Sequence, residues 1–207
     1  MKDNQTITDD ASLYKAYRDK LLADTTKELY EMAISSSQPG MCFSNSSYFH
    51  ALILTNLMLE KASSSLRIFA GEFFYRIFND LEDSFSKFFS NFKKPDKNRI
   101  IIALHINNIS EKDEKIAEQR EKYEKIFKKY ESSMQWGICA TLKYLPHLYI
   151  LDDRMLREED PHLPRTENAA SNTVTARVYF NSPNLAQNRS QAFDTIWQKV
   201  NRENLQM

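Results

Sequence analysis

The spacing of apolar residues along the chain alternates between a helical and a strand-like period, and this alternation indicates the fold. Near the N-terminus, apolar residues recur at three- and four-residue spacing after a polar lead: Leu13, Tyr14, Tyr17, Leu21 and Leu22. The polar run 35–40, which ends in Pro-Gly, interrupts this helical pattern. We therefore expect residues 1–40 to form an N-terminal helix and linker, and residues 41–207 to form one α/β domain.

The rest of the chain alternates short strand-like runs with longer helical patterns. Helical spacing predicts helices at about 47–62, 72–90 and 110–130, and a last one from Pro183. Strand-like runs occupy 66–70, 99–106, 136–142, 147–151, 155–158 and 173–180. The run 100–104 is apolar throughout, which is typical of a strand covered on both faces. Together these elements predict an α/β fold with a mixed, mostly buried sheet flanked by helices.

Composition narrows the functional classes. The 28 basic and 28 acidic residues cancel, so no global field attracts nucleic acid or an anionic membrane. The two cysteines, Cys42 and Cys139, form no CxxC pair, and three glycines are too few for glycine-rich phosphate loops. No run resembles a signal peptide or a bilayer-spanning helix. We expect a soluble, cytoplasmic protein with no cofactor, no metal cluster and no membrane association.

Two segments in the second half of the chain carry a family resemblance. They read HLYILDDRMLREED (147–160) and TARVYFNSPNLAQNRSQAFDTIW (175–197), and they follow a helix–strand–helix–strand order. Over about residues 47–200 the chain resembles one half of a phospholipase D-like domain. In that family a strand carries His-x-Lys, and an Asp follows after four further residues. The resemblance implies that one histidine attacks phosphorus, that a second one, usually from another half, acts as the acid, and that lysines hold the phosphate charge.

The family motif is incomplete in this sequence. Tyr149 stands two positions after His147, where the family has lysine. Asp152 and Asp153 follow His147 by five and six residues instead of seven. A lysine two positions on is also missing after the other histidines, which are His50, His105 and His162. The resemblance therefore implies a degenerate, single half-unit.

Several polar residues near these segments are candidates for a site. His147 is either a surviving nucleophile or phosphate contact, or a strand-edge histidine with a backbone partner. A charged turn and its return strand hold Asp152, Asp153, Arg154, Arg157, Glu158 and Glu159. This cluster is either a partner or phosphate site with arginine as the anion clamp, or a hairpin with weak surface ion pairs. Asn181 and Asn184 stand at the start of the last helix. They either flank N–H groups that bind an anion, or they belong to a plain N-cap.

Three functions follow from these observations. The leading hypothesis is a non-catalytic or weakly catalytic phospholipase D-like module that binds a protein partner, as an accessory subunit of a bacterial assembly for stress or anti-phage defence. The second is a divergent, metal-independent phosphodiesterase or nuclease, in which Arg157 or Lys143 replaces the lost lysine and a homodimer supplies the second histidine. The third is a nucleic-acid-binding module without catalysis, which the zero net charge disfavours.

Overall fold

The computed structural model describes residues 17–22, 24, 25, 28, 32, 42–45, 48–71, 74–91, 99–105, 112–139, 145–160 and 175–204 of the 207-residue chain. Within them lies one seven-stranded sheet. Its strands, in spatial order, are β1 (Cys42–Asn45), β7 (Ala176–Tyr179), β6 (Met155–Glu159), β5 (His147–Leu151), β2 (Leu66–Ala70), β3 (Ile100–His105) and β4 (Gln135–Cys139). Strands β2, β3 and β4 pair in parallel, and the other pairs are antiparallel. The predicted mixed sheet is confirmed.

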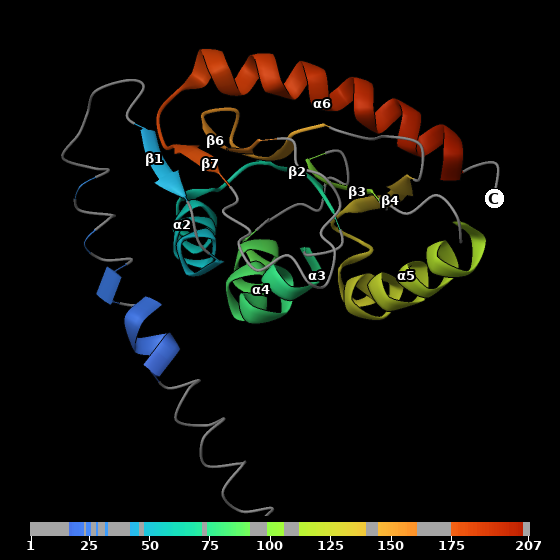
Figure 1. Cartoon of the computed structure of the whole chain (residues 1–207), viewed down its shortest axis with the longest axis horizontal. Coiled ribbons are helices and arrows are strands. Elements are labelled where there is room, and N and C mark those ends of the chain that lie inside the picture. Colours follow the sequence, from blue (N-terminus) through green and yellow to red (C-terminus); the bar gives the residue numbers. More distant parts are fainter. Residues whose placement is uncertain are drawn as a thin grey trace, which may run out of the picture.

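Helices cover both faces of the sheet (Figure 1). One face carries α2 (Tyr48–Lys61), α3 (Phe74–Asp80), α4 (Glu82–Ser90), α5 (Lys112–Phe127) and the 3-10 turn η1 (Lys128–Tyr130). The long helix α6 (Pro183–Asn204) lies along the other face. The two layers explain why β3 is buried at all six positions, as its apolar run predicts. The α/β fold class is confirmed.

The phenylalanine-rich segment belongs to the core. Its rings pack on one another and on α5, and the buried members are Phe74, Phe78, Phe85, Phe88 and Phe89. The sequence predicts one helix here, but the chain forms α3 and α4 with a break at Leu81, where φ is −116° and ψ is 24°. Leu81 itself is buried at this break, and both short helices lie on the same side of the sheet as α2 and α5 (Figure 1).

The described part of the N-terminal segment contacts this core. Arg18 forms an ion pair with Asp80 at 3.1 Å, and the side chain of Leu22 is buried in the cluster between the sheet and α2–α5. The boundary predicted near residue 40 stays a prediction, because residues 33–41 lie outside the described residues. Among the helices that the structure describes, none has the length and apolarity needed to cross a membrane.

The turn between β5 and β6 fixes the start of β2. Asp152 and Asp153 have φ values of 54° and 50°, a left-handed conformation that Asp tolerates better than most residues. The Asp152 carboxylate accepts backbone N–H groups of Ser63, Ser64 and Ser65 at 2.8, 2.8 and 3.0 Å. Burial opposes ionisation of this carboxyl, but these hydrogen bonds outweigh burial and hold the pKa of Asp152 below its ordinary value.

We expect Asp152→Asn to lower the free energy of unfolding by about 1–2 kcal/mol at pH 7. Some of the N–H groups that now donate to the carboxylate would lose their acceptor. Asn keeps the tolerance for positive φ. Since the folded-state pKa of Asp152 lies below the unfolded one, its stabilisation is present above the unfolded pKa and disappears as the pH falls through the folded pKa.

Urea unfolding of both proteins at pH 7 and in acid measures this effect, and the difference between them should shrink in acid. Asp24→Asn changes an exposed carboxylate and serves as the control, with an expected effect within about 0.5 kcal/mol. Equal stability of wild type and Asp152→Asn at pH 7 would contradict this role of the turn.

Candidate functional site

Three neighbouring strands bring two histidines to the same end of the sheet. His105 is the last residue of β3, and His147 is the first residue of β5. Strand β2 lies between them, parallel to β3 and antiparallel to β5, and Gly71 follows its last residue. In antiparallel β6, Glu159 is the direct partner of His147. Residues from four strands therefore meet at one point, where parallel strands end and an open α/β sheet typically binds ligands.

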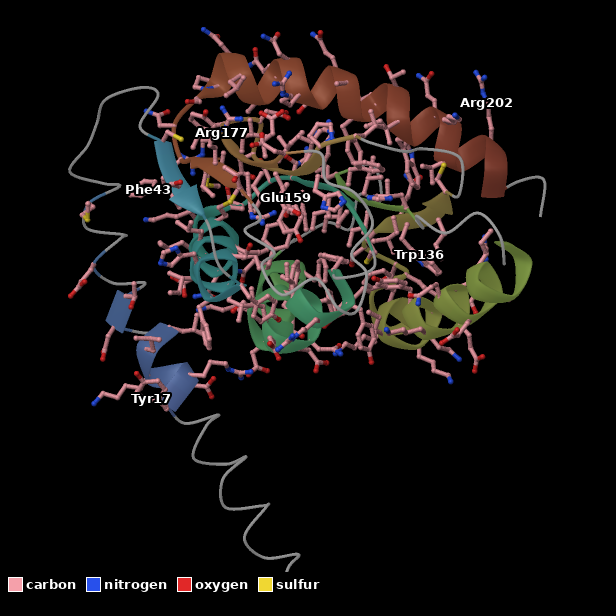
Figure 2. The ribbon with its side chains drawn as sticks, viewed as in Figure 1. Tyr17, Phe43, Trp136, Glu159, Arg177 and Arg202 are labelled. Carbon is pink, nitrogen blue, oxygen red and sulfur yellow. The ribbon has the colours of Figure 1, made fainter. Side chains whose placement is uncertain are left out.

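The side chains form a connected polar chain. The Nε2 atoms of His105 and His147 lie 2.6 Å apart. The Nδ1 atom of His147 lies 3.2 Å from Glu159 Oε1, and the other carboxylate oxygen accepts a hydrogen bond from Arg157 Nη2 at 2.9 Å. Glu159 lies among the interior side chains in Figure 2. Arg157 is only 2% exposed and His105 5%, so this group is largely withdrawn from water.

The carboxylate of Glu159 fixes the protons of the pair. An ionised carboxylate only accepts, so His147 carries its proton on Nδ1 and donates it to Glu159. In the neutral ring the Nε2 atom of His147 then holds a lone pair. The 2.6 Å contact needs one donor, which is the Nε2–H group of His105. The two imidazoles are therefore chemically different: His147 Nε2 accepts with its lone pair, and His105 Nε2 carries the proton.

Small and apolar neighbours hold the two rings in place. A Cβ atom at Gly71 would lie 3.3 Å from the Nε2 atoms of both histidines, so a side chain here would crowd their meeting point. The ring of Phe69 stacks on His105, with centroids 5.1 Å apart and planes inclined by 25°. It also meets the ring of His147 edge-on at 6.3 Å. Both histidines are thus oriented before any ligand arrives.

Arg157 supplies a positive charge beside Tyr149. Tyr149 and Arg157 are direct partners on β5 and β6, and the guanidinium carbon lies 5.1 Å from the centre of the Tyr149 ring. Burial raises the pKa of the Tyr149 hydroxyl, although the charge of Arg157 acts the other way. Arg157 is buried, and its ion-pair partner is Glu159, because residues 157 and 159 share one face of the strand.

The structure does not bring the other candidates to the histidine pair. Asp152, Asp153 and Arg154 follow the far end of β5, about 16 Å along the strand from His147. There Asp153 binds Arg67 and Ser190, and Arg154 donates to the Lys61 carbonyl.

The remaining candidates lie elsewhere on the surface or outside the described chain. Glu158 forms an ion pair with Arg189 of α6 at 2.9 Å. Asn181 and Asn184 are exposed at the start of α6, and Ser182 is the residue that directly precedes the helix and accepts its first hydrogen bond. Lys143 lies outside the described residues. A binding role for any of these residues stays a prediction.

Sequence reasoning missed His105 and Glu159 as partners of His147. The signal for His105 was a histidine that directly follows the apolar run 100–104. For Glu159 the signal was the alternation of side chains along a strand, which places residue 159 on the same face as Arg157. Because His105 belongs to the same chain, the second histidine does not have to come from a homodimer.

No protein-family model and no curated protein matches this sequence. Among solved structures, the archaeal chromatin protein TrmBL2, which binds DNA, is similar over 95% of this chain and 65% of that chain, with 16% identity and a TM-score of 0.54. The phospholipase D family member Nuc from Salmonella typhimurium covers 76% of this chain and 94% of its own, with 13% identity and a TM-score of 0.47. NucT from Helicobacter pylori covers 76% and 96%, with 11% identity and a TM-score of 0.44.

These likenesses concern the fold. The chain spans about two thirds of the chromatin protein (65%), and 16% identity establishes a shared arrangement of elements and nothing about activity. The scores of the two phospholipase D family members, 0.47 and 0.44, are too low to carry an argument. The chemistry of the site must therefore be argued from its own side chains.

We expect that lysine cannot replace Tyr149 as a single change. Tyr149→Lys would place an ammonium group in a buried position beside Arg157, so the free energy of unfolding should fall by about 3 kcal/mol or more. Tyr149→Phe keeps the ring and should cost about 1 kcal/mol or less. Combining Tyr149→Lys with Arg157→Leu removes the repulsion and should recover part of the loss. Chemical unfolding measures all three, and a stable single Lys variant would show that Arg157 does not fill the cationic position.

Proposed function

We propose that this chain is a metal-independent phosphodiesterase of phospholipase D-like fold, in which both reacting histidines belong to one chain. The contact of 2.6 Å between the Nε2 atoms of His105 and His147 is the observation that supports it best. One nitrogen has a lone pair and the other a proton, which are the two functions that cleavage of a phosphodiester requires. Arg157 supports the proposal as the nearby fixed cation.

In the proposed first step, the Nε2 lone pair of His147 attacks phosphorus while the bond to the leaving oxygen breaks. That oxygen takes the Nε2 proton of His105. The product is a phosphoryl group bonded to His147. His105 enters this step as the imidazolium, so loss of the Nε2 proton leaves a neutral ring with a proton on Nδ1 and a bare Nε2. Since the attacking and leaving atoms stand roughly in line across phosphorus, the ester must enter between the two rings and separate them from their 2.6 Å contact.

In the second step, water attacks the phosphorus of the phosphohistidine. His105 Nε2 accepts a proton from this water, and the P–N bond breaks to restore the lone pair of His147. Throughout, Glu159 holds the Nδ1 proton of His147 and stabilises the positive charge that develops on this ring. Arg157 acts on Glu159 and keeps its carboxylate in position.

A second candidate function is a protein-binding accessory module without catalysis, in a bacterial assembly for stress or anti-phage defence. Two observations favour it: Tyr149 stands in the lysine position, and the charge of Arg157 is already engaged by Glu159. A third possibility is nucleic-acid binding. The fold is shared with a chromatin protein that binds DNA, so DNA is the first natural phosphodiester to test.

The two histidines should respond differently to the leaving group. We expect His147→Ala to lower kcat/KM at least 10²-fold on both a single-stranded DNA oligonucleotide and bis(4-nitrophenyl) phosphate, because the nucleophile is lost. His105→Ala should lower kcat/KM by a similar factor on DNA and much less on the nitrophenyl ester, since nitrophenolate leaves without a proton. Reactions in excess EDTA test the metal independence.

His50→Ala removes an exposed histidine on α2 and should leave both rates unchanged. An acid-labile phosphoryl adduct on His147, trapped by rapid quenching, would support the covalent step. Absence of turnover by the wild-type chain, or turnover that neither histidine variant affects, would rule out the proposed phosphodiesterase. The accessory module would then be the better hypothesis.

A further inference from the structure

The converging nitrogens of His105 and His147 suit a metal ion as well as a proton. We propose that this pair is a binding site for a divalent ion that prefers imidazole, Zn²⁺ above all, and that its occupancy blocks the phosphodiester reaction. The inhibition rests on the proposed function, whereas the binding does not.

The spacing of the two nitrogens is close to what a metal needs. Zinc binds histidine nitrogen at about 2.0–2.1 Å, so two such ligands at a tetrahedral angle lie about 3.3 Å apart. The Nε2 atoms stand 2.6 Å apart, so the two rings need to move apart by less than about 1 Å to admit the ion. The ester needs a larger separation than this, because phosphorus and the leaving oxygen must fit between the rings.

The space at the meeting point is kept open by Gly71. An added Cβ would lie 3.3 Å from the Nε2 atoms of both histidines. A side chain at this position would therefore crowd both nitrogens, and glycine avoids this.

The groups behind the histidines are those that support a metal-binding imidazole. A histidine that binds a metal usually donates its other N–H group to a carboxylate, which fixes the ring and strengthens the ligand. His147 does so toward Glu159, and Arg157 holds that carboxylate in turn. The ring of His105 is held by stacking on Phe69. Both rings are thus oriented before an ion binds, and binding requires His105 to give up its Nε2 proton and to carry its remaining proton on Nδ1.

The expected affinity is that of a reversible inhibitor. Among the described residues, no group of three or more His, Cys, Asp or Glu side chains is placed to hold a metal ion together. Two imidazoles plus water or a small anion make a weaker site than the three or four protein ligands of catalytic and structural zinc. An ion on Nε2 of His147 occupies the lone pair that the reaction needs.

Calorimetric titration of ZnCl₂ into the full chain, stripped with EDTA and dialysed, tests the site. We expect one ion per chain for the wild type and for His50→Ala, and at least a tenfold loss of affinity in His105→Ala and in His147→Ala. Gly71→Ala keeps both imidazoles and should also weaken binding, and Glu159→Gln should do so by about 10- to 100-fold. Circular dichroism confirms that each variant is folded, and X-ray absorption of the zinc-loaded chain should show nitrogen ligands at about 2.0–2.1 Å.

A wild-type chain that binds no zinc, or binding that survives the loss of either histidine, would overturn the proposal. Failure of the zinc-site proposal can be distinguished from failure of the proposed phosphodiesterase function. Zinc bound at the pair in a chain without phosphodiesterase activity supports the site and refutes only the enzyme. In an active chain, zinc should lower kcat and EDTA should restore it, and an active chain that zinc saturates without inhibition would refute the block.

Discussion

Strand β2 lies between a parallel neighbour, β3, and an antiparallel neighbour, β5, and the polar centre depends on this placement. It brings together His105 and His147, which are 42 positions apart in the sequence. Because β2 ends at Ala70 and Gly71 carries no side chain, the two imidazoles can meet over the end of the strand. The strand is held at its other end by the Asp152 carboxylate, which accepts the N–H groups of the residues that lead into it.

The buried charges beside the histidines carry a cost that the fold must offset. Removing Arg157 and Glu159 from water is unfavourable, and a buried ion pair recovers this only with good geometry and further hydrogen bonds. Here the carboxylate binds the guanidinium on one side and His147 on the other, and the guanidinium faces the Tyr149 ring. Well-packed apolar residues in place of a buried ion pair often leave stability unchanged or raise it. Their presence at the end of the strands is therefore better explained by a function of the site than by stability.

Much of the fold could be predicted from the sequence, because hydrophobic period and turn residues are local signals. The apolar run 100–104 and the long last helix were assigned correctly. The division of the segment 72–90 at Leu81 was not, since the aromatic spacing fits one continuous helix and tertiary packing decides the break. The family motif drew attention to His147, but it concerns only the neighbours of a histidine along the chain. His105 could not be joined to His147 without the strand order, whereas Glu159 was within reach by simple alternation from Arg157.

The most direct test of this account is the protonation of the two imidazoles. Two-bond ¹H–¹⁵N NMR spectra of the histidine rings, assigned with His105→Ala and His147→Ala, report which nitrogen carries hydrogen. We expect His147 to be protonated at Nδ1 and bare at Nε2, and His105 to be protonated at Nε2, with a signal that shifts when His147 is removed. A His147 protonated at Nε2 alone, or a His105 signal that does not respond to the loss of His147, would contradict the coupled pair on which the proposed chemistry rests.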